Sequence, residues 1–319
     1  MKTALLGSFP RPRLLSKHVQ QFRGGKFPED KLMAEISRIS SRLLGLAKEA
    51  AIDYVTGGNF LWDDIVDMAC SQVTCHERNG LMRFYENNFY YRAPVLKGQL
   101  ETRDQEYLTL TRLFRSQFDK NHAEGAKLKS SLLGPISFAS LSQDSYYNDR
   151  VEVAFAYSKA LNRSMLNVQE VVDAFEIQDP SIFDRRADQK LRSRVSEIYQ
   201  SLVGGVTKEK HLITYFFLDS SSLKQFFDLP VDVFGLDMIE GRNKMRQIYP
   251  FVKERRVYLG VLDSRTTKME RVSSIKRMAS RFSAKGASDV IVGFNSFTDF
   301  IPEIVASRKV RLLGKVKKA

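Results

Sequence analysis

Short apolar runs recur along the chain, and helix-like patterns separate most of them. Eight runs rich in β-branched and aromatic residues end in polar residues, Gly or Pro, and they cover residues 3–7, 52–57, 129–134, 171–178, 212–218, 231–239, 256–262 and 289–294. Strands that are buried on both faces of a parallel sheet have such near-continuous apolar sequences. Eight of them with crossover helices predict an α/β protein of the (β/α)8 TIM-barrel class, with residues 1–319 forming a single domain.

The helical pattern is clearest after Pro28. Apolar residues recur there at spacings of three and four, which places them on one face of a helix: Leu32, Ile36, Ile39, Leu43 and Ala47. Proline at the start costs no intrahelical hydrogen bond, and the following acidic residues suit the positive end of the helix dipole. Further helices are predicted over residues 14–22, 63–69, 105–122 and 148–167.

One segment departs from this alternation. Residues 84–99 (FYENNFYYRAPVLKGQ) combine aromatic residues with an Asn-Asn pair. This composition predicts a β-hairpin-like excursion after strand two, at one end of the barrel. Aromatic residues next to Arg92 and Lys97 also suit stacking on nucleic-acid bases. We interpret the cluster instead as a small hydrophobic cover.

The composition limits the classes of function. The chain has 50 Lys and Arg against 37 Asp and Glu, a formal net charge of +13. This charge suits an anionic ligand or partner, although solvated helix faces and the basic C-terminal segment explain much of the excess. No apolar run approaches the roughly 20 residues that span a bilayer, and the apolar N-terminal stretch is too short for a signal peptide. A cytoplasmic protein with no membrane partner is therefore expected.

The two cysteines lie close together in the sequence. Cys70, Cys75 and His76 share the segment CSQVTCHE. A metal site is one interpretation, but zinc sites use closer cysteine pairs and a second pair of ligands. Two cysteines do not make a disulfide framework. We therefore expect ordinary thiols near a helix end.

In barrels of this class, the C-terminal ends of the strands and the loops after them form the functional site. The candidates at these ends are Arg11, Arg13, Asn59, Asp63, Pro135, Ser137, Gln178, Asp179, Tyr215, Phe217, Asp219, Asp237, Glu240, Asp263, Arg265 and Asn295. Paired carboxylates act as general acid and base, or hold a divalent cation. A structural ion pair between Asp263 and Arg265 is an equally good interpretation of those two residues.

These strand ends do not carry the residues that several kinds of catalysis and binding need. Neither cysteine and none of the four histidines follows a predicted strand: His211 lies at the start of one, and His18, His76 and His122 fall on helices or loops. A soft metal therefore has few candidate ligands. No Ser-His-Asp order, P-loop or GxGxxG motif occurs, so acyl transfer and nucleotide binding lack support.

The order of motifs resembles cobalamin-independent methionine synthase, an enzyme built from two related (β/α)8 barrels. Residues 5–32 resemble the opening of each barrel of that family. Six further segments resemble the N-terminal barrel of that family and follow one another in the same order: residues 50–67, 91–99, 130–142, 212–217, 229–241 and 259–268. The resemblance implies a role in methionine biosynthesis, where the family's methyltransferase moves a methyl group from 5-methyltetrahydrofolate polyglutamate to homocysteine.

The chain departs from the zinc-bearing, C-terminal barrel of that family. Residues 214–217 read TYFF where the zinc barrel has a His-x-Cys pair, and the last strand reads VGFNSF where a further zinc cysteine belongs. Gln178, in EIQDP, stands at a family aspartate position. The resemblance thus implies a stand-alone N-terminal barrel that binds no metal or cofactor, with zinc in a separate partner barrel.

The resemblance also implies a role for basic residues. Lys97, in VLKGQ, matches the lysine with which the family holds the folate tail, and residues 13–17 (RLLSK) fall where the family has a basic cluster. The implied tail-binding residues are Arg11, Arg13, Lys17 and Lys97. A polyglutamate tail presents several carboxylates to them, and another anionic methyl donor is the alternative ligand.

Three functions remain open at this point. The first is the N-terminal half of a split methionine synthase, which docks to a zinc-bearing barrel and is inactive alone. The second is a self-sufficient methyltransferase or lyase, whose barrel-mouth candidates are Asn59, Asp63, Asp179, Asp237, Asp263 and Arg265. The third is a nucleic-acid-binding module, although the basic residues form no nucleic-acid motif.

Overall fold

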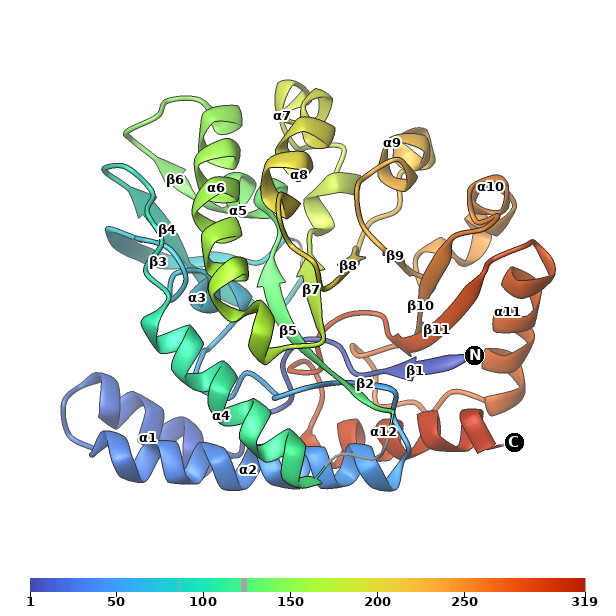
Figure 1. Cartoon of the computed structure of the whole chain (residues 1–319), viewed down its shortest axis with the longest axis horizontal. Coiled ribbons are helices and arrows are strands. Elements are labelled where there is room, and N and C mark those ends of the chain that lie inside the picture. The colour runs from blue at the N-terminus through green and yellow to red at the C-terminus, as the bar shows by residue number, and fades with distance from the viewer. Residues whose placement is uncertain (86, 122–124, 319) are drawn as a thin grey trace.

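Eight parallel strands close into a barrel in the computed structural model, which describes residues 1–85, 87–121 and 125–318. The hydrogen-bonded order around the barrel is β1-β11-β10-β9-β8-β7-β5-β2 (Figure 1). Its strands are β1 (Lys2–Ala4), β2 (Tyr54–Thr56), β5 (Lys127–Leu133), β7 (Ala174–Gln178), β8 (Glu209–Ile213), β9 (Val233–Asp237), β10 (Arg256–Leu262) and β11 (Asp289–Phe294). This confirms the predicted (β/α)8 TIM-barrel class, and each predicted strand overlaps one strand of the barrel.

Helices surround the barrel. The longer ones are α1 (Arg13–Arg23), α2 (Glu29–Glu49), α4 (Gln105–Asn121), α6 (Arg150–Val168), α8 (Val195–Val203), α11 (Val272–Ala284) and α12 (Glu303–Lys318). The short helices are α3 (Ile65–Ala69), α5 (Pro135–Leu141), α7 (Gln189–Ser193), α9 (Leu223–Phe227) and α10 (Met245–Ile248). Single 3-10 turns cover Gln169–Val171, Pro180–Phe183, Ser220–Ser222, Gly241–Lys244 and Tyr249–Phe251.

The predicted helical stripe is the buried face of α2. All five of its predicted apolar positions are buried, and Pro28 is the N-cap residue. α2 packs against α1, α4 and α12, along the lower edge of Figure 1. The helix predicted over residues 105–122 is α4, and His122 lies outside the described residues. Within the described ranges, no helix is both long and apolar enough to span a membrane.

A three-stranded sheet stands beside the end of the barrel at which the strands finish, which we call the mouth. β3 (Glu77–Arg83) and β4 (Tyr90–Leu96) pair antiparallel, and β6 (Gln143–Asp144) extends this sheet from β4. The predicted hairpin-like excursion is confirmed, but its first strand begins at Glu77 and not at residue 84. All seven residues of β3 are exposed. No apolar alternation therefore marks this strand, and pairing with β4 keeps it extended.

The strand predicted over residues 212–218 ends early. β8 stops at Ile213, and Phe216 takes a left-handed conformation with a φ of 69°. The Phe216 backbone N–H donates to the buried carboxylate of Asp237 at 3.2 Å. The aromatic residues after Ile213 therefore leave the sheet and turn into the mouth. Their β-propensity is overridden by this tertiary contact.

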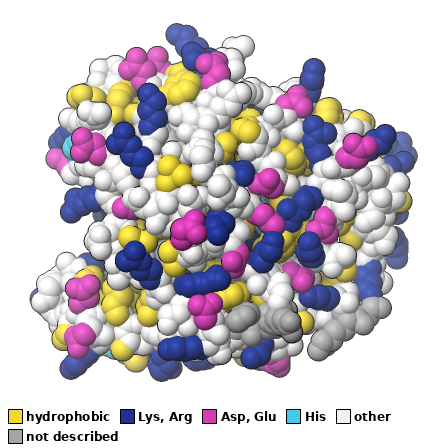
Figure 2. Space-filling model, in the orientation of Figure 1, with side chains coloured by type: hydrophobic (Ala, Val, Ile, Leu, Met, Phe, Trp, Pro, Cys, Tyr) yellow, Lys and Arg dark blue, Asp and Glu magenta, His cyan; other side chains and the backbone are white. Residues whose placement is uncertain are grey.

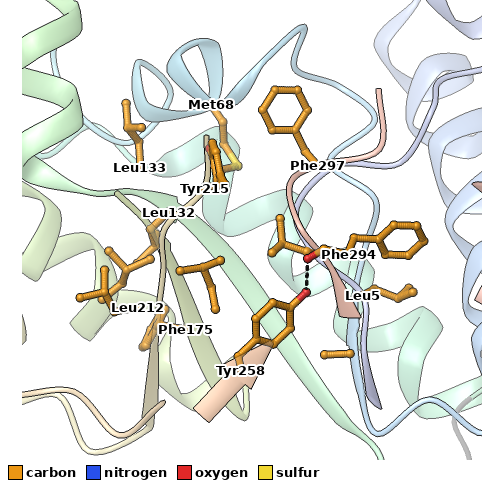
Figure 3. Packing of buried hydrophobic residues seen from close by; sticks show 14 of the residues in the cluster. Leu5, Met68, Leu132, Leu133, Phe175, Leu212, Tyr215, Tyr258, Phe294 and Phe297 are labelled. Carbon is orange, nitrogen blue, oxygen red and sulfur yellow. Dashed lines mark hydrogen bonds between the residues drawn. The ribbon is translucent and has the colours of Figure 1, made fainter. Parts of the chain in front are cut away.

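Large buried side chains pack around the strands of the barrel. Figure 3 shows Leu132, Phe175 and Leu212 close together on one side, with Leu5 and Tyr258 on the other, and all five are buried. The Tyr258 hydroxyl donates to the backbone carbonyl of Phe294 at 2.6 Å. The interior is thus a packed core, as in other barrels of eight strands, and not a pore.

One ion pair lies inside this core, and the sequence patterns did not predict it. Lys129 on β5 pairs with Glu176 on β7, and neither side chain has exposed surface. The Lys129 ammonium also donates to the Leu5 carbonyl at 2.8 Å. Glu176 accepts from the Gly7 backbone N–H at 2.8 Å and from the Ser131 hydroxyl at 3.2 Å. These partners offset the desolvation of two buried charges and connect three elements of the barrel.

A disulfide joins Cys70 to Cys75, with 5.3 Å between their Cα atoms. The expectation of ordinary thiols is therefore wrong. The alternative metal site would need both sulfurs as ligands, and both are bonded to each other instead. Cys70 follows α3, Cys75 precedes β3, and the chain between them folds back on itself. This path brings the two Cα atoms within disulfide reach, and the spacing in the sequence does not define it.

Candidate functional site

Aromatic side chains close the mouth of the barrel. Rings from the hairpin tip, from the turn after β8 and from the loop after β11 pack edge to face or tilted, with centroids 5.4 Å apart for Phe89–Phe300, 5.9 Å for Phe84–Phe297 and 6.2 Å for Phe84–Phe216. We call this group the aromatic lid, and its members are Phe84, Tyr85, Phe89, Phe216, Phe297 and Phe300. The arrangement agrees with the hydrophobic cover expected from residues 84–99.

Asp179 lies in the mouth and is fully buried. Its carboxylate accepts from the backbone N–H groups of Ile136 at 3.2 Å and Ser137 at 2.7 Å, and from the hydroxyl groups of Ser137 at 2.6 Å and Tyr199 at 2.8 Å. Burial raises the pKa of Asp179 to about 6. The side chain thus binds the first turn of α5 and anchors α8, so its oxygens are used within the fold.

Asp237 ends β9 and is buried as well. It accepts from the Phe216 backbone N–H, from the Ile239 backbone N–H at 2.9 Å and from the Asn295 side-chain amide at 3.1 Å. Burial raises the pKa of Asp237 to about 6, against the opposing effect of the Arg265 guanidinium. Two predicted strand-end residues, Asp237 and Asn295, are therefore brought together, and both hold neighbouring loops.

Asp263 and Arg265 form an ion pair with 3.4 Å between Nε and Oδ1. The Arg265 guanidinium also donates to Glu240 at 2.9 Å and lies 5.7 Å from the centre of the Phe216 ring. Of the two interpretations that the sequence allowed, the structural ion pair is the one present. Arg265 thereby fixes one side of the aromatic lid.

Asn59 lies at the edge of the mouth, in a left-handed conformation with a φ of 53°. It lines a groove of about 520 Å³ together with Arg11, Trp62 and Asp299. Asp299 accepts a hydrogen bond from the Ser8 hydroxyl, and burial raises its pKa. The strand-end survey missed Asp299 because it lies five residues beyond the end of β11. A survey extended through each whole loop would have included it.

Asp63 lies apart from the buried mouth carboxylates, in a chain of ion pairs. Arg11 and Arg23 both donate to Asp63, Arg23 and Arg78 both donate to Asp67, and the two Arg23 contacts are each 2.5 Å long. We call these five residues, Arg11, Asp63, Arg23, Asp67 and Arg78, the rim network. It joins the loop after β1 to α1, α3 and β3. Three guanidinium groups face two carboxylates, so the rim network carries net positive charge.

The other predicted tail-binding residues lie next to the rim network. Lys97, just after β4, pairs with Glu77 at 2.6 Å, and Glu77 precedes Arg78 in β3. The Lys97 backbone N–H donates to His76 at 3.4 Å. Arg13 and Lys17 are exposed on α1, the helix that ends in Arg23. Arg11 thus belongs to the rim network, Arg13 and Lys17 share α1 with Arg23, and Lys97 is paired with a residue of β3.

The described residues do not fit a zinc site. In the part of the chain that the structure describes, no group of three or more His, Cys, Asp or Glu side chains is placed to hold a metal ion. His211 lies at the start half of β8, away from the mouth, and pairs with Glu209 at 3.1 Å. Burial lowers the pKa of His211 to about 4.

Charges of both signs mix on the surface. On the face drawn in Figure 2, Lys and Arg side chains alternate with Asp and Glu and do not merge into one basic stripe. Many of the basic side chains form ion pairs with a carboxylate, as Arg194 does with Glu197 and Arg115 with Asp173. On this face the excess of positive charge therefore does not gather into one basic patch.

The fold and these contacts define a (β/α)8-barrel protein with a covered mouth and a basic, ion-paired rim. Comparison with known sequences makes this more specific. Residues 75–284 match the family described as "Cobalamin-independent synthase, N-terminal domain". The chain belongs to this family, and it is thus a methionine synthase family member of the N-terminal domain type.

Curated relatives agree with this assignment. A methionine synthase from Sulfolobus acidocaldarius is 24% identical over 278 residues, which cover 86% of this chain and 78% of the relative. A methionine synthase from Saccharolobus solfataricus is 23% identical over 189 residues, covering 59% of this chain and 55% of the relative. The second alignment thus spans about half the length of that relative.

Solved structures share the fold. A B12-independent methionine synthase from Shewanella sp. W3-18-1, in complex with selenomethionine, superposes with a TM-score of 0.81 at 15% identity and covers 99% of this chain and 96% of that chain. A methyltransferase from Methanosarcina mazei gives a TM-score of 0.60 at 14% identity, covering 100% of this chain and 94% of that chain. At these identities the likeness concerns the fold alone.

Proposed function

We propose that this chain is the N-terminal, tail-binding barrel of a split methionine synthase. It holds the anionic tail of a methylfolate or a similar methyl donor with Arg11, Arg13, Lys17 and Lys97, and it docks to a separate zinc-bearing barrel. The rim network carries the proposal, because it joins the loop of Arg11 and the helix of Arg13 and Lys17 to β3, whose Glu77 pairs with Lys97. Membership in the N-terminal domain family supports it.

The ion pairs of the rim leave room for ligand carboxylates. Lys97 and Glu77 are 51% and 57% exposed, and an exposed pair of this kind contributes only about 0–1 kcal/mol. A tail carboxylate therefore replaces Glu77 at little cost. Exposed Arg13 and Lys17 add further contacts, each worth about 1 kcal/mol or less and each weakened by salt.

Substitution of Lys97 tests the tail site. We expect Lys97→Gln to weaken binding of a γ-linked pentaglutamate peptide by about three- to tenfold, since one charged contact is lost. Isothermal titration calorimetry at low and moderate salt measures the change, and the loss shrinks as salt rises. Lys253→Gln is the matched control, because Lys253 is an exposed lysine paired with Glu254, just before β10 and away from the mouth.

Equal affinity of both variants, or no binding of the peptide by the unmodified chain, would contradict the tail site. Lys17→Gln extends the test to α1. Its effect should add to that of Lys97→Gln if both residues contact one extended ligand.

The partner supplies the chemistry in this proposal. Zinc in the partner barrel holds homocysteine as a thiolate, and this chain contributes the binding and orientation of the methyl donor. Mixing the chain with a zinc-bearing barrel of the same family should give a complex in gel filtration and a faster formation of methionine. Methyl transfer by this chain alone, with methyl donors and divalent ions, would instead favour the self-sufficient enzyme.

A further inference from the structure

The two sulfurs of the disulfide have different surroundings. Cys70 lines a groove of about 460 Å³, whose other walls include Phe22 on α1, Arg78 on β3 and Arg103 before α4. Cys75 packs against the hydrophobic core. Attack on a disulfide proceeds along the S–S axis and depends on access to one sulfur. The groove therefore makes Cys70 the sulfur that an external thiol reaches first.

The groove is lined by charges of both signs. Arg78 and Arg103 both line it, together with Glu29 and Glu106. Arg78 pairs with Asp67, whereas Trp62 donates to Glu106 at 3.0 Å. These charges offset one another, so the direction of attack depends on access to Cys70 Sγ.

The segment between the cysteines is held by other contacts as well. The Thr74 backbone N–H donates to the Glu101 carbonyl at 2.8 Å, and the Arg103 backbone N–H donates to the Gln72 carbonyl at 2.9 Å. Val73, between them, is fully buried. These contacts keep the segment folded without the sulfur bridge, so opening of the disulfide does not require unfolding of the barrel.

We propose that Cys70 and Cys75 form a reversible dithiol–disulfide site, which a small dithiol or a dithiol protein reduces through the groove. One thiolate of the reductant attacks Cys70 Sγ, the Cys70–Cys75 bond breaks, and Cys75 leaves as a thiolate that takes up a proton. The second thiol of the reductant then attacks the mixed disulfide and releases Cys70. The reductant becomes a disulfide, and the chain gains two electrons and two protons.

The state of the bridge controls the start of β3. Cys75 is followed by His76 and Glu77, and both contact Lys97. With the bridge open, His76 and Glu77 lose one covalent restraint, and the Lys97 contacts loosen. This consequence for ligand affinity rests on the proposed tail site, whereas the thiol chemistry does not.

Redox titration of the full chain tests the chemistry. The folded protein is equilibrated with mixtures of reduced and oxidised dithiothreitol, and its free thiols are counted by mass after alkylation. We expect two thiols to appear together, to disappear on reoxidation, and to leave the far-UV circular dichroism unchanged. A bridge that opens only when the protein unfolds, or that never forms in air, would overturn the proposal.

Two single-cysteine variants test the direction of attack. Cys75→Ser leaves Cys70 at the groove, and Cys70→Ser leaves Cys75 against the core. We expect Cys75→Ser to react with a small aromatic disulfide at least about tenfold faster than Cys70→Ser, because access from the groove favours Cys70. Equal rates, or faster reaction of Cys75, would overturn the assigned entry through Cys70.

Hydrogen exchange separates this site from the proposed function. In the reduced chain, amides of residues 71–83 should exchange faster while those of β5 and β7 stay protected. Unchanged exchange over residues 71–83 would overturn control of β3 by the bridge. If this exchange changes and pentaglutamate affinity does not, the switch holds and the tail site at Lys97 is wrong.

Discussion

At the scale of single residues, the polar candidates of the mouth divide into buried and exposed groups. Asp179 and Asp237 have no exposed surface, and backbone N–H groups occupy their oxygens. Arg13, Lys17 and Lys97 are exposed. A ligand that arrives from solvent meets the basic group first. The buried carboxylates serve instead to hold the loops from which the mouth is built.

The raised pKa of Asp179 predicts a specific pH dependence. A carboxyl group with a pKa of about 6 in the folded chain and about 3.9 in the unfolded chain stabilises the fold below pH 4, and this contribution is lost as pH rises through 6. The unfolding free energy of the unmodified chain should therefore fall between pH 4.5 and 7.5. We expect Asp179→Asn to make this fall smaller by about 1–3 kcal/mol, because asparagine does not ionise. Urea denaturation at both pH values measures it.

Asp119→Asn is the control for this experiment, since the Asp119 side chain is 58% exposed on α4. It should leave the pH dependence as it is in the unmodified chain. The same pH dependence in Asp179→Asn and in the unmodified chain would mean that Asp179 ionises in the fold as it does in water.

At the scale of elements, the hairpin of β3 and β4 is an addition to the eight-stranded barrel. β3 is exposed at every residue, whereas the tip of the hairpin places Phe84 and Tyr85 in the mouth. The Tyr85 hydroxyl donates to the Ser137 hydroxyl at 3.0 Å and lies 2.8 Å from that of Ser181. The hairpin is thus attached both by β4, in which Tyr91, Ala93 and Leu96 are buried, and by its tip, which aromatic packing holds in place.

Truncation at the tip should therefore loosen the hairpin. Phe84 has no exposed surface, and its ring centroid lies 6.2 Å or less from those of five lid or strand rings. We expect Phe84→Ala to reduce the unfolding free energy by about 3–5 kcal/mol and to expose the hairpin to proteases. Leu81→Ala, in the same hairpin but 65% exposed, should change it by about 0.5 kcal/mol or less.

Chemical denaturation gives the free energies, and limited proteolysis locates the loosened segment. A Phe84→Ala protein as stable and as protease-resistant as Leu81→Ala would refute the role of the aromatic lid.

At the scale of the whole molecule, the Lys129–Glu176 pair connects strands that are distant in sequence. The segment after β1 and the strands β5 and β7 all contribute to its contacts, so the pair fixes how these parts of the barrel meet. A buried pair adds little net stability over apolar residues of the same size, but removal of one partner leaves an unpaired charge in the core. The pair therefore contributes to the fold mainly by requiring its two strands to lie next to each other in one register.

A double-mutant cycle tests this role. We expect Lys129→Met to cost about 3–5 kcal/mol of unfolding free energy, since Glu176 is left unpaired, and Lys129→Met with Glu176→Gln to recover a large part of it. Thermal and urea denaturation supply the four free energies. Lys253→Met, which removes an exposed ion pair, should cost less than about 1 kcal/mol. Additive costs at positions 129 and 176 would show that the two charges do not interact.

The sequence by itself determined the barrel and the helix faces around it. Buried parallel strands must be apolar along their whole length and helices must carry an apolar stripe, so both leave a periodic signal. β10 and β11 occur where the pattern predicted them, at residues 256–262 and 289–294. Collinear motifs also indicated the family, because the same residues recur at the strand ends of its N-terminal barrel.

Only the tertiary structure decided which residues meet. The Cys70–Cys75 bridge, the Lys129–Glu176 pair and the rim network join atoms whose proximity depends on the path of the chain. β3 left no signal, because an exposed strand buries no face and is defined by its partner. Periodicity records what each segment buries, whereas contacts between segments depend on how the whole chain closes.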